Sequence, residues 1–316
     1  MQDKKKLRIY FTDFWRKFDI NDNFFYTLLS SRFDVIIDPI NPQLLIYSYT
    51  GYEFLKYKSS VRLFFTGENK RPNFTEADFS LSFDFSDYGN KNLRLPLYVL
   101  YGEEELLLKR KIVEEIVLGK PHFCNMVVSN SGAKHRIEFF KILNNIKKVD
   151  SGGSVLNNIG HKVKDKLEFI QQYRFTMAFE NSSYPGYTTE KIFEPMKVNS
   201  IPIYWGNKDI GKEFNAKSFI NVHDFSSLQE AAQYVVSIDD DKDKYKNMLK
   251  EPWFVNNQLN EYFDHTRILD FIETTVLQVH PFSAARLKER NKNATKGLLL
   301  KLGYLFLKGH PYYATE

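Results

Sequence analysis

Polar side chains that could bind an anionic ligand are concentrated in residues 175–206. Asn181 follows a short apolar run, and Tyr187, Glu190 and Lys191 come soon after it. A lysine supplies a point charge for a phosphate group. A helix that starts among these residues would add free backbone amides and the positive end of its dipole. The stretch therefore predicts a site for a phosphate-bearing ligand.

The elements around these side chains can be predicted from the same stretch. Residues 175–179 form a short apolar run typical of a buried parallel strand, and turn-forming residues follow it. Thr188 and Thr189 then offer a hydroxyl N-cap for a helix, and residues 200–206 suit a second strand. This order favours a right-handed parallel crossover, whose ligands bind at the carboxyl ends of the strands. Pro195 should kink or shorten the helix.

The sequence FENSSYPGYTTEK, followed by IPIYWG, resembles the donor-binding motif of glycosyltransferase family 10, above all of bacterial α-1,3-fucosyltransferases. The resemblance extends over residues 63–225. Further matching segments occur in the order of the family: FTGEN at 65–69, SN at 129–130 with Arg136 downstream, KKVDSGG at 147–153 and KSFINVHDF at 217–225.

This resemblance implies an α/β fold of GT-B architecture, in which two Rossmann-like domains face each other across a cleft. It also implies an enzyme that takes L-fucose from GDP-fucose and inverts the anomeric centre. The implied acceptor is the 3-hydroxyl of N-acetylglucosamine in a lactosamine-type glycan, which gives a Lewis x type product. A 4-hydroxyl or other acceptor and a binding protein without turnover remain as alternatives.

The resemblance assigns catalytic roles to three residues. Inverting transfer needs a base for the acceptor hydroxyl and positive charge for the departing diphosphate. Glu68 is implied as the base, although a loop carboxylate could instead pair with Lys70 or Arg71. Arg136 and Lys191 are implied to neutralise the diphosphate, while a solvated helix position is the alternative for Arg136.

Four residues are expected to complete the donor site. Glu190 would accept hydrogen bonds from the ribose, although it could also stabilise the first helical turn. Asn181 and Tyr187 would contact ribose or phosphate, as their matched family positions do. Glu180, at the end of the strand, could touch the fucose or oppose a developing oxocarbenium charge.

The apolar runs also predict the domain organisation. Residues 1–118 are expected to form an acceptor-binding domain, with strands near 7–11, 33–37, 43–47, 61–65, 79–83 and 93–100 and a helix over 103–118. Residues 119–280 are expected to form the GDP-fucose-binding domain. Residues 281–316 form a basic, Leu-rich tail that could be a cationic amphipathic helix on a membrane surface or could pack across the domains.

Metal chemistry is not required by these assignments. The acidic run at residues 239–243 mimics a metal site, but its position between two helical patterns favours helix capping. No histidines have the spacing of a ligand pair such as HExxH. Arg and Lys can neutralise the leaving group, so a divalent metal would at most stimulate the reaction.

Composition excludes several other classes. The net charge is +5, but acidic and basic residues alternate through most of the chain, which argues against a nucleic-acid partner. Cys124 is the one cysteine, so an intramolecular disulfide is impossible. The first residues are charged rather than apolar, and we therefore expect a cytoplasmic protein, peripheral at the inner membrane face if the tail binds lipid.

Overall fold

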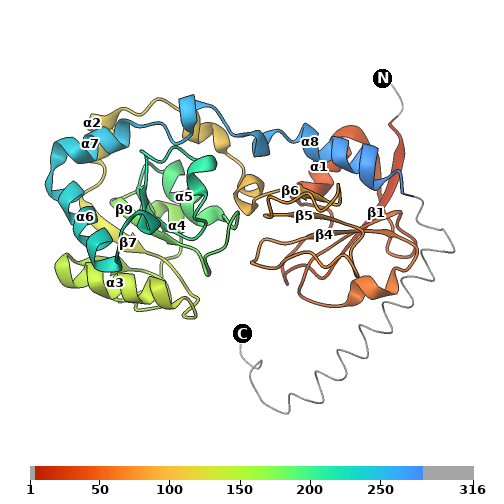
Figure 1. Ribbon diagram of the computed structural model, residues 1–316, viewed down its shortest axis with the longest axis horizontal. Helices are drawn as coiled ribbons and strands as arrows, with labels where there is room; N and C mark the ends of the chain where they lie inside the picture. Colours follow the sequence, from red (N-terminus) through yellow and green to blue (C-terminus); the bar gives the residue numbers. More distant parts are fainter. Residues whose placement is uncertain (1–3, 280–316) are drawn as a thin grey trace, which may run out of the picture.

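The computed structural model describes residues 4–279, which form two α/β units side by side along the long axis of the molecule (Figure 1). Each unit is built on a parallel sheet with helices packed against it. Purely parallel sheets are covered on both faces, which explains why the central strands are continuous apolar runs rather than alternating ones.

The first sheet has six parallel strands in the order β2-β1-β3-β4-β5-β6. The strands are β1 (Lys6–Thr12), β2 (Asp34–Ile37), β3 (Leu44–Tyr47), β4 (Val61–Phe65), β5 (Phe79–Ser82) and β6 (Asn92–Arg94). Every residue of β3 and β4 is buried. Helix α1 (Phe24–Arg32) starts at Asn23, whose side chain accepts a hydrogen bond from the Tyr26 amide.

The second sheet has five parallel strands in the order β11-β10-β9-β7-β8. The strands are β7 (His122–Met126), β8 (Val149–Ser151), β9 (Tyr173–Phe179), β10 (Ile201–Trp205) and β11 (Ile220–Asn221), and the helices are α3 (Lys134–Ile146), α4 (Lys166–Ile170), α5 (Glu190–Lys197), α6 (Leu228–Asp240) and α7 (Lys242–Lys250). Strands β9 and β10 pair in parallel and α5 connects them, as predicted for a parallel crossover.

The segment between the two sheets differs from its prediction. Residues 93–100 were expected to form one strand, but β6 ends at Arg94 and a 3-10 helix, Leu97–Tyr101, follows Pro96. Proline cannot donate to a ladder, and its φ of −64° starts the helix instead. The helix expected over residues 103–118 is divided into a 3-10 helix, Glu104–Leu108, and α2 (Val113–Leu118).

The end of the described chain returns to the first unit. Helix α8 (Thr266–Phe271) and the π-helical turn Ile272–Val276 lie beside α1, at the blue end of the colour scale in Figure 1. Arg32 pairs with Asp270 at 2.6 Å and with Glu273 at 3.1 Å. This part of the predicted second domain therefore packs on the first.

No helix within residues 4–279 is both long and apolar enough to cross a bilayer. The predicted tail, residues 281–316, lies outside the described residues.

The acidic run caps a helix, as predicted. The Asp241 side chain accepts from the amides of Asp243 and Lys244 at the start of α7. Asp239 is buried and pairs with Lys147 at 2.6 Å and with Arg174 at 2.5 Å. Over residues 4–279 there is no group of three or more His, Cys, Asp or Glu side chains that could hold a metal ion.

Candidate active site

A buried carboxylate holds the N-cap residue of α5 in place. Glu180 follows β9 and has no exposed surface. Its Oε1 accepts from the Thr189 backbone amide at 2.7 Å, and its Oε2 accepts from the Thr189 hydroxyl at 2.8 Å. Lys191 Nζ lies 3.2 Å from the same Oε2. Glu180 thereby ties the end of β9 to the N-cap of α5.

Two close approaches shape the loop between these elements. Gly206 directly follows β10, and a Cβ there would lie 2.4 Å from Glu180 Cγ. The glycine therefore makes room for the Glu180 side chain. Gly186 has a φ of +82°, and a Cβ there would meet the Phe83 carbonyl oxygen at 2.5 Å. The turn chemistry read from the sequence thus allows the loop to lie against both the second sheet and the first domain.

The opposite charges of Lys191 and Glu190 at the start of α5 stabilise each other. Lys191 Nζ also lies 3.4 Å from Glu190 Oε1. Burial lowers the pKa of Lys191, but Glu180 and Glu190 outweigh it and raise that pKa above its ordinary value. Burial likewise raises the pKa of Glu190, yet Lys191 and Lys166 hold it below its usual range. Both groups are therefore ionised at neutral pH.

Arg136, in the first turn of α3, joins the ends of two strands. The side chain is 1% exposed, and its Nη2 donates to the Phe179 carbonyl at 2.6 Å and to Asn181 Oδ1 at 2.9 Å. Its Nη1 donates to the Asn130 carbonyl at 3.3 Å. Its Nε is buried and lacks a hydrogen-bond partner among the described residues. A buried donor without a partner is costly, so Arg136 is held here by its other hydrogen bonds.

A cavity of 220 Å³ collects four of the predicted site residues in the second domain. Arg136, Asn181, Glu190 and Lys191 line it, together with Lys166, which the sequence analysis missed. The other lining residues are Val127, Val128, Ser129, Asn130, Thr176, Met177 and Pro195. Cationic and hydrogen-bonding groups at the start of a helix can hold a diphosphate and a ribose.

Glu68 approaches this region from the first domain. It lies in the loop after β4, and its backbone amide donates to Thr66 Oγ1 at 3.0 Å. Tyr187, in the loop before α5, donates from its hydroxyl to Glu68 Oε2 at 3.3 Å. The structure therefore brings Glu68 and Tyr187 together, although neither lines the 220 Å³ cavity.

Neither alternative partner of Glu68 pairs with its carboxylate among the described residues. Arg71 pairs with Asp84 and lies 4.9 Å from the centre of the Tyr184 ring. Among the described residues Glu68 forms no ion pair with Lys70. Next to Glu68, Asn69 Nδ2 donates to Ser182 Oγ at 2.7 Å, which gives a second contact between the two loops.

Glu180 does not lie in the wall of the cavity. The prediction is that it touches the fucose or opposes an oxocarbenium charge, but the side chain is fully covered, which leaves it no surface for contact. Its oxygens accept from Thr189 and face Lys191, so it positions the residues that do line the cavity.

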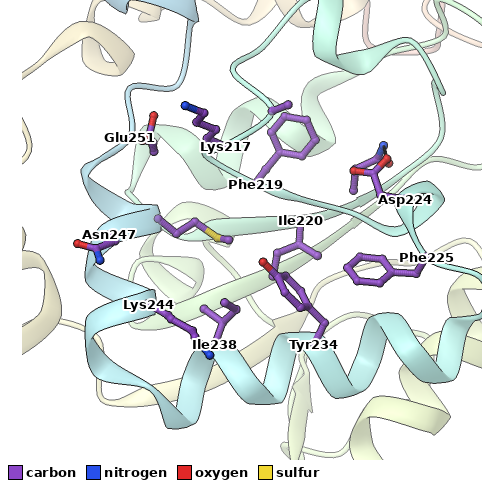
Figure 2. Close-up of a pocket in the computed structure, with 13 residues that line it drawn as sticks. Lys217, Phe219, Ile220, Asp224, Phe225, Tyr234, Ile238, Lys244, Asn247 and Glu251 are labelled. Carbon is purple, nitrogen blue, oxygen red and sulfur yellow. Dashed lines mark hydrogen bonds between the residues drawn. The ribbon is translucent and has the colours of Figure 1, made fainter.

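A larger cavity lies elsewhere in the second domain. It has a volume of 670 Å³ and lies between β11 and the helices α6 and α7, with Phe219, Ile220 and Tyr234 among its walls (Figure 2). None of the predicted site residues lines it. Size alone is thus a poor guide to the active site here.

Comparisons with known proteins identify the family of the chain. Residues 9–101 match the model of the alpha-(1,3)-fucosyltransferase FucT N-terminal domain, and residues 117–272 match that of the C-terminal part of glycosyltransferase family 10 (fucosyltransferase). The alpha-(1,3)-fucosyltransferase FucT of Helicobacter pylori is 32% identical over an alignment of 329 positions. The alignment covers 89% of this chain and 69% of that protein.

Solved structures extend the similarity to the fold. A crystal structure of an alpha1,3-fucosyltransferase with GDP-fucose has 30% sequence identity and a TM-score of 0.75, and the match covers 88% of this chain and 93% of that one. The Anabaena protein HepE in complex with UDP-glucose shares the fold alone, at 11% identity and a TM-score of 0.51 over 86% of this chain and 100% of its own.

These findings confirm both the predicted α/β fold of GT-B architecture and the family resemblance. The two matched segments cover both parallel sheets and include Glu68, Arg136 and the start of α5. The chain therefore belongs to glycosyltransferase family 10, the fucosyltransferases.

Proposed function

We propose that this protein transfers L-fucose from GDP-fucose to the 3-hydroxyl of N-acetylglucosamine in a lactosamine-type glycan, with inversion at the anomeric carbon. The observation that carries this proposal is the contact between Glu68 of the first domain and Tyr187 of the donor loop. It joins a carboxylate of the first domain to the loop that leads into α5, whose first residues line the cationic cavity of the second domain. The GDP-fucose complex of a similar enzyme supports the choice of donor.

The residues of the cavity would hold the nucleotide part of the donor. Lys191 and the Arg136 guanidinium would neutralise the diphosphate, and the amides at the start of α5 would add to them. Ionised Glu190 would accept from the ribose hydroxyls. Asn181, whose Oδ1 accepts from Arg136, would present its amide group to ribose or phosphate.

The reaction would proceed in one displacement. The acceptor hydroxyl oxygen forms a bond to the anomeric carbon while the bond from that carbon to the diphosphate oxygen breaks. The electron pair of the broken bond leaves with GDP, and the proton of the acceptor hydroxyl passes to Glu68. Lys191 and Arg136 stabilise the negative charge that develops on the leaving group. Glu180 acts through Lys191 and Thr189 as a positioning residue.

Fucose transfer to N-acetyllactosamine tests this proposal directly. The product linkage would be determined by NMR, with a chelator in a parallel reaction. We expect an α-1,3-linked product in both reactions. A 1,4-linked product would show that the protein is a fucosyltransferase with a different acceptor hydroxyl. Tight GDP-fucose binding without any transfer would favour a sugar-nucleotide-binding protein. A cytoplasmic location with peripheral membrane contact through residues 281–316 stays a prediction from the sequence.

A further inference from the structure

A second cavity opens at the carboxyl end of the first sheet, in the domain opposite the donor cavity. Its volume is 440 Å³, within the range of roughly 300–1,000 Å³ that is usual for small-molecule sites. It lies between the loop after β1, the start of α1 and the 3-10 helix that follows β6. Its walls include Trp15, Lys17, Asp22, Phe25, Leu97 and Tyr101.

This cavity shares its walls with the loop that carries Glu68. Leu97 packs against Gly67, since a Cβ on that glycine would lie 2.8 Å from Leu97 Cδ1. Phe25 packs on Phe65, the last residue of β4, with ring centres 4.8 Å apart. The cavity therefore adjoins the strand end from which Glu68 projects.

Tyr101 connects the cavity to the donor side. Its backbone carbonyl accepts from Lys197 Nζ, at the end of α5, at 3.2 Å. Burial and the negative charges of Glu190, Glu180 and Glu68 all raise the pKa of its hydroxyl. The backbone contact with Lys197 joins this side of the cavity to α5, the helix whose first residues line the donor cavity.

The walls of the cavity suit a sugar ring. Trp15 and Tyr101 are 48% and 44% exposed, which leaves ring surface for the apolar face of a sugar. Phe14 and Phe18 hold the Trp15 ring edge-on, with centres 5.5 and 5.3 Å away. Lys17 and Asp22 add one donor and one acceptor for hydroxyl groups.

We infer that this cavity binds the sugar ring next to the one that receives fucose, with Trp15 and Tyr101 as its stacking platform. The inference rests on the proposed function, because it assumes a glycan acceptor attacked at Glu68. A ring that presents its hydroxyl to Glu68 would have its neighbour within reach of the cavity. The cavity would accordingly make the enzyme prefer an acceptor of two or more sugars over a single one.

Kinetics with two acceptors test this inference. For the wild type and for Trp15→Ala and Tyr101→Ala, kcat/KM would be measured with N-acetyllactosamine and with N-acetylglucosamine. We expect the ratio of the two values to fall about tenfold in each variant, the scale of one lost aromatic anchor. Trp15→Phe should keep most of the ratio because it retains a flat apolar ring. GDP-fucose affinity, measured by calorimetry, reports whether each variant keeps its donor site.

Tyr234→Ala is the matched control, because Tyr234 is 39% exposed and lines the other large cavity. Its ratio should equal that of the wild type. An unchanged ratio in both Trp15→Ala and Tyr101→Ala would overturn the inference while leaving the proposed function intact. If the wild type transfers to neither acceptor, saturation-transfer NMR with N-acetyllactosamine still decides, since the signal of the second ring should depend on Trp15.

Discussion

The hydrogen bond from Tyr187 to Glu68 indicates how the candidate base is positioned. Burial, Glu180 and Glu68 raise the pKa of the Tyr187 hydroxyl well above its ordinary value, so this group keeps its proton at neutral pH. It can then only donate to the carboxylate, at 3.3 Å. This contact holds the Glu68 carboxylate against the loop that leads into α5.

Glu68→Gln should therefore keep GDP-fucose affinity and lose transfer by about 100-fold or more, the scale of a missing general base. The substitution preserves shape and removes only the proton acceptor. Calorimetry with GDP-fucose and initial rates with N-acetyllactosamine would measure the two effects. Glu115→Gln, at an exposed position in α2, serves as the control. Near-normal turnover of Glu68→Gln would remove Glu68 from this role.

Lys191→Ala should weaken GDP-fucose binding and also slow transfer. Its charge acts on the diphosphate both before and during bond cleavage, so kcat and donor affinity should fall together. The change also leaves Glu180 buried without its cationic neighbour. Titration calorimetry and single-turnover rates would separate the two effects, with the exposed Lys208→Ala as the control. Unchanged affinity and rate would contradict the placement of Lys191.

At the scale of elements, α5 depends on its first residues more than on its length. It spans only eight residues and contains Pro195, which cannot donate a backbone hydrogen bond. Short helices are marginal by themselves, so its orientation must come from packing and from the N-cap. Thr189 supplies that cap. Its backbone amide and its hydroxyl also donate hydrogen bonds to Glu180.

Thr189→Val should lower the free energy of unfolding by about 1–2 kcal/mol, the usual cost of a lost N-cap. It should also weaken GDP-fucose binding, because the amides and Lys191 at the start of α5 lose their support. Chemical denaturation and calorimetry would measure the two effects. Ser227→Ala, which removes the N-cap of α6, should give a similar loss of stability without a change in donor affinity. Equal donor affinities in both variants would show that the cap of α5 is only structural.

The strands and the donor loop could be predicted because short apolar runs and turn residues encode them locally. Residues 93–118 could not, because their path depends on distant contacts. Lys111 lies 3.2 Å from the centre of the Trp253 ring and donates to the Glu251 carbonyl at 2.6 Å, which holds the chain extended between the two helices. Likewise, Lys166 lies in a lysine-rich stretch without a motif and reaches the cavity only in the fold.

At the scale of the molecule, a buried ion pair joins the two domains. Arg94, at the end of β6, donates from Nη2 to Glu213 Oε1 of the second domain at 2.7 Å, and from Nη1 to the Gly186 carbonyl at 3.1 Å. Neither side chain is more than 5% exposed. The partners are 119 residues apart, which is why no local pattern in the sequence could reveal the pair.

Arg94→Ala should destabilise the protein by about 3–5 kcal/mol, since it leaves Glu213 buried and uncompensated. Burial already raises the pKa of Glu213, and Arg94 opposes that rise, so its loss raises the pKa further. A carboxyl whose folded pKa is raised contributes stability at low pH that is lost as the pH increases. The melting temperature should accordingly fall more at pH 8 than at pH 5.

Arg32→Ala is the control for this experiment, because Arg32 pairs with Asp270 and Glu273 at the surface between α1 and α8. Surface pairs contribute little, so its melting temperature should change only slightly at either pH. A deficit in Arg94→Ala that is the same at pH 5 and pH 8 would argue against an uncompensated Glu213.

The return of α8 to the first domain has a consequence for how the protein is made. In chain order, every strand of the second sheet precedes α8, yet α8 covers α1, and Phe271 packs on Phe79 of the first sheet. The first domain therefore leaves the ribosome with this apolar face exposed. The face can be covered only after the whole second domain has been translated. Its completion is a late event of synthesis, during which the bare face is the surface that a chaperone would recognise.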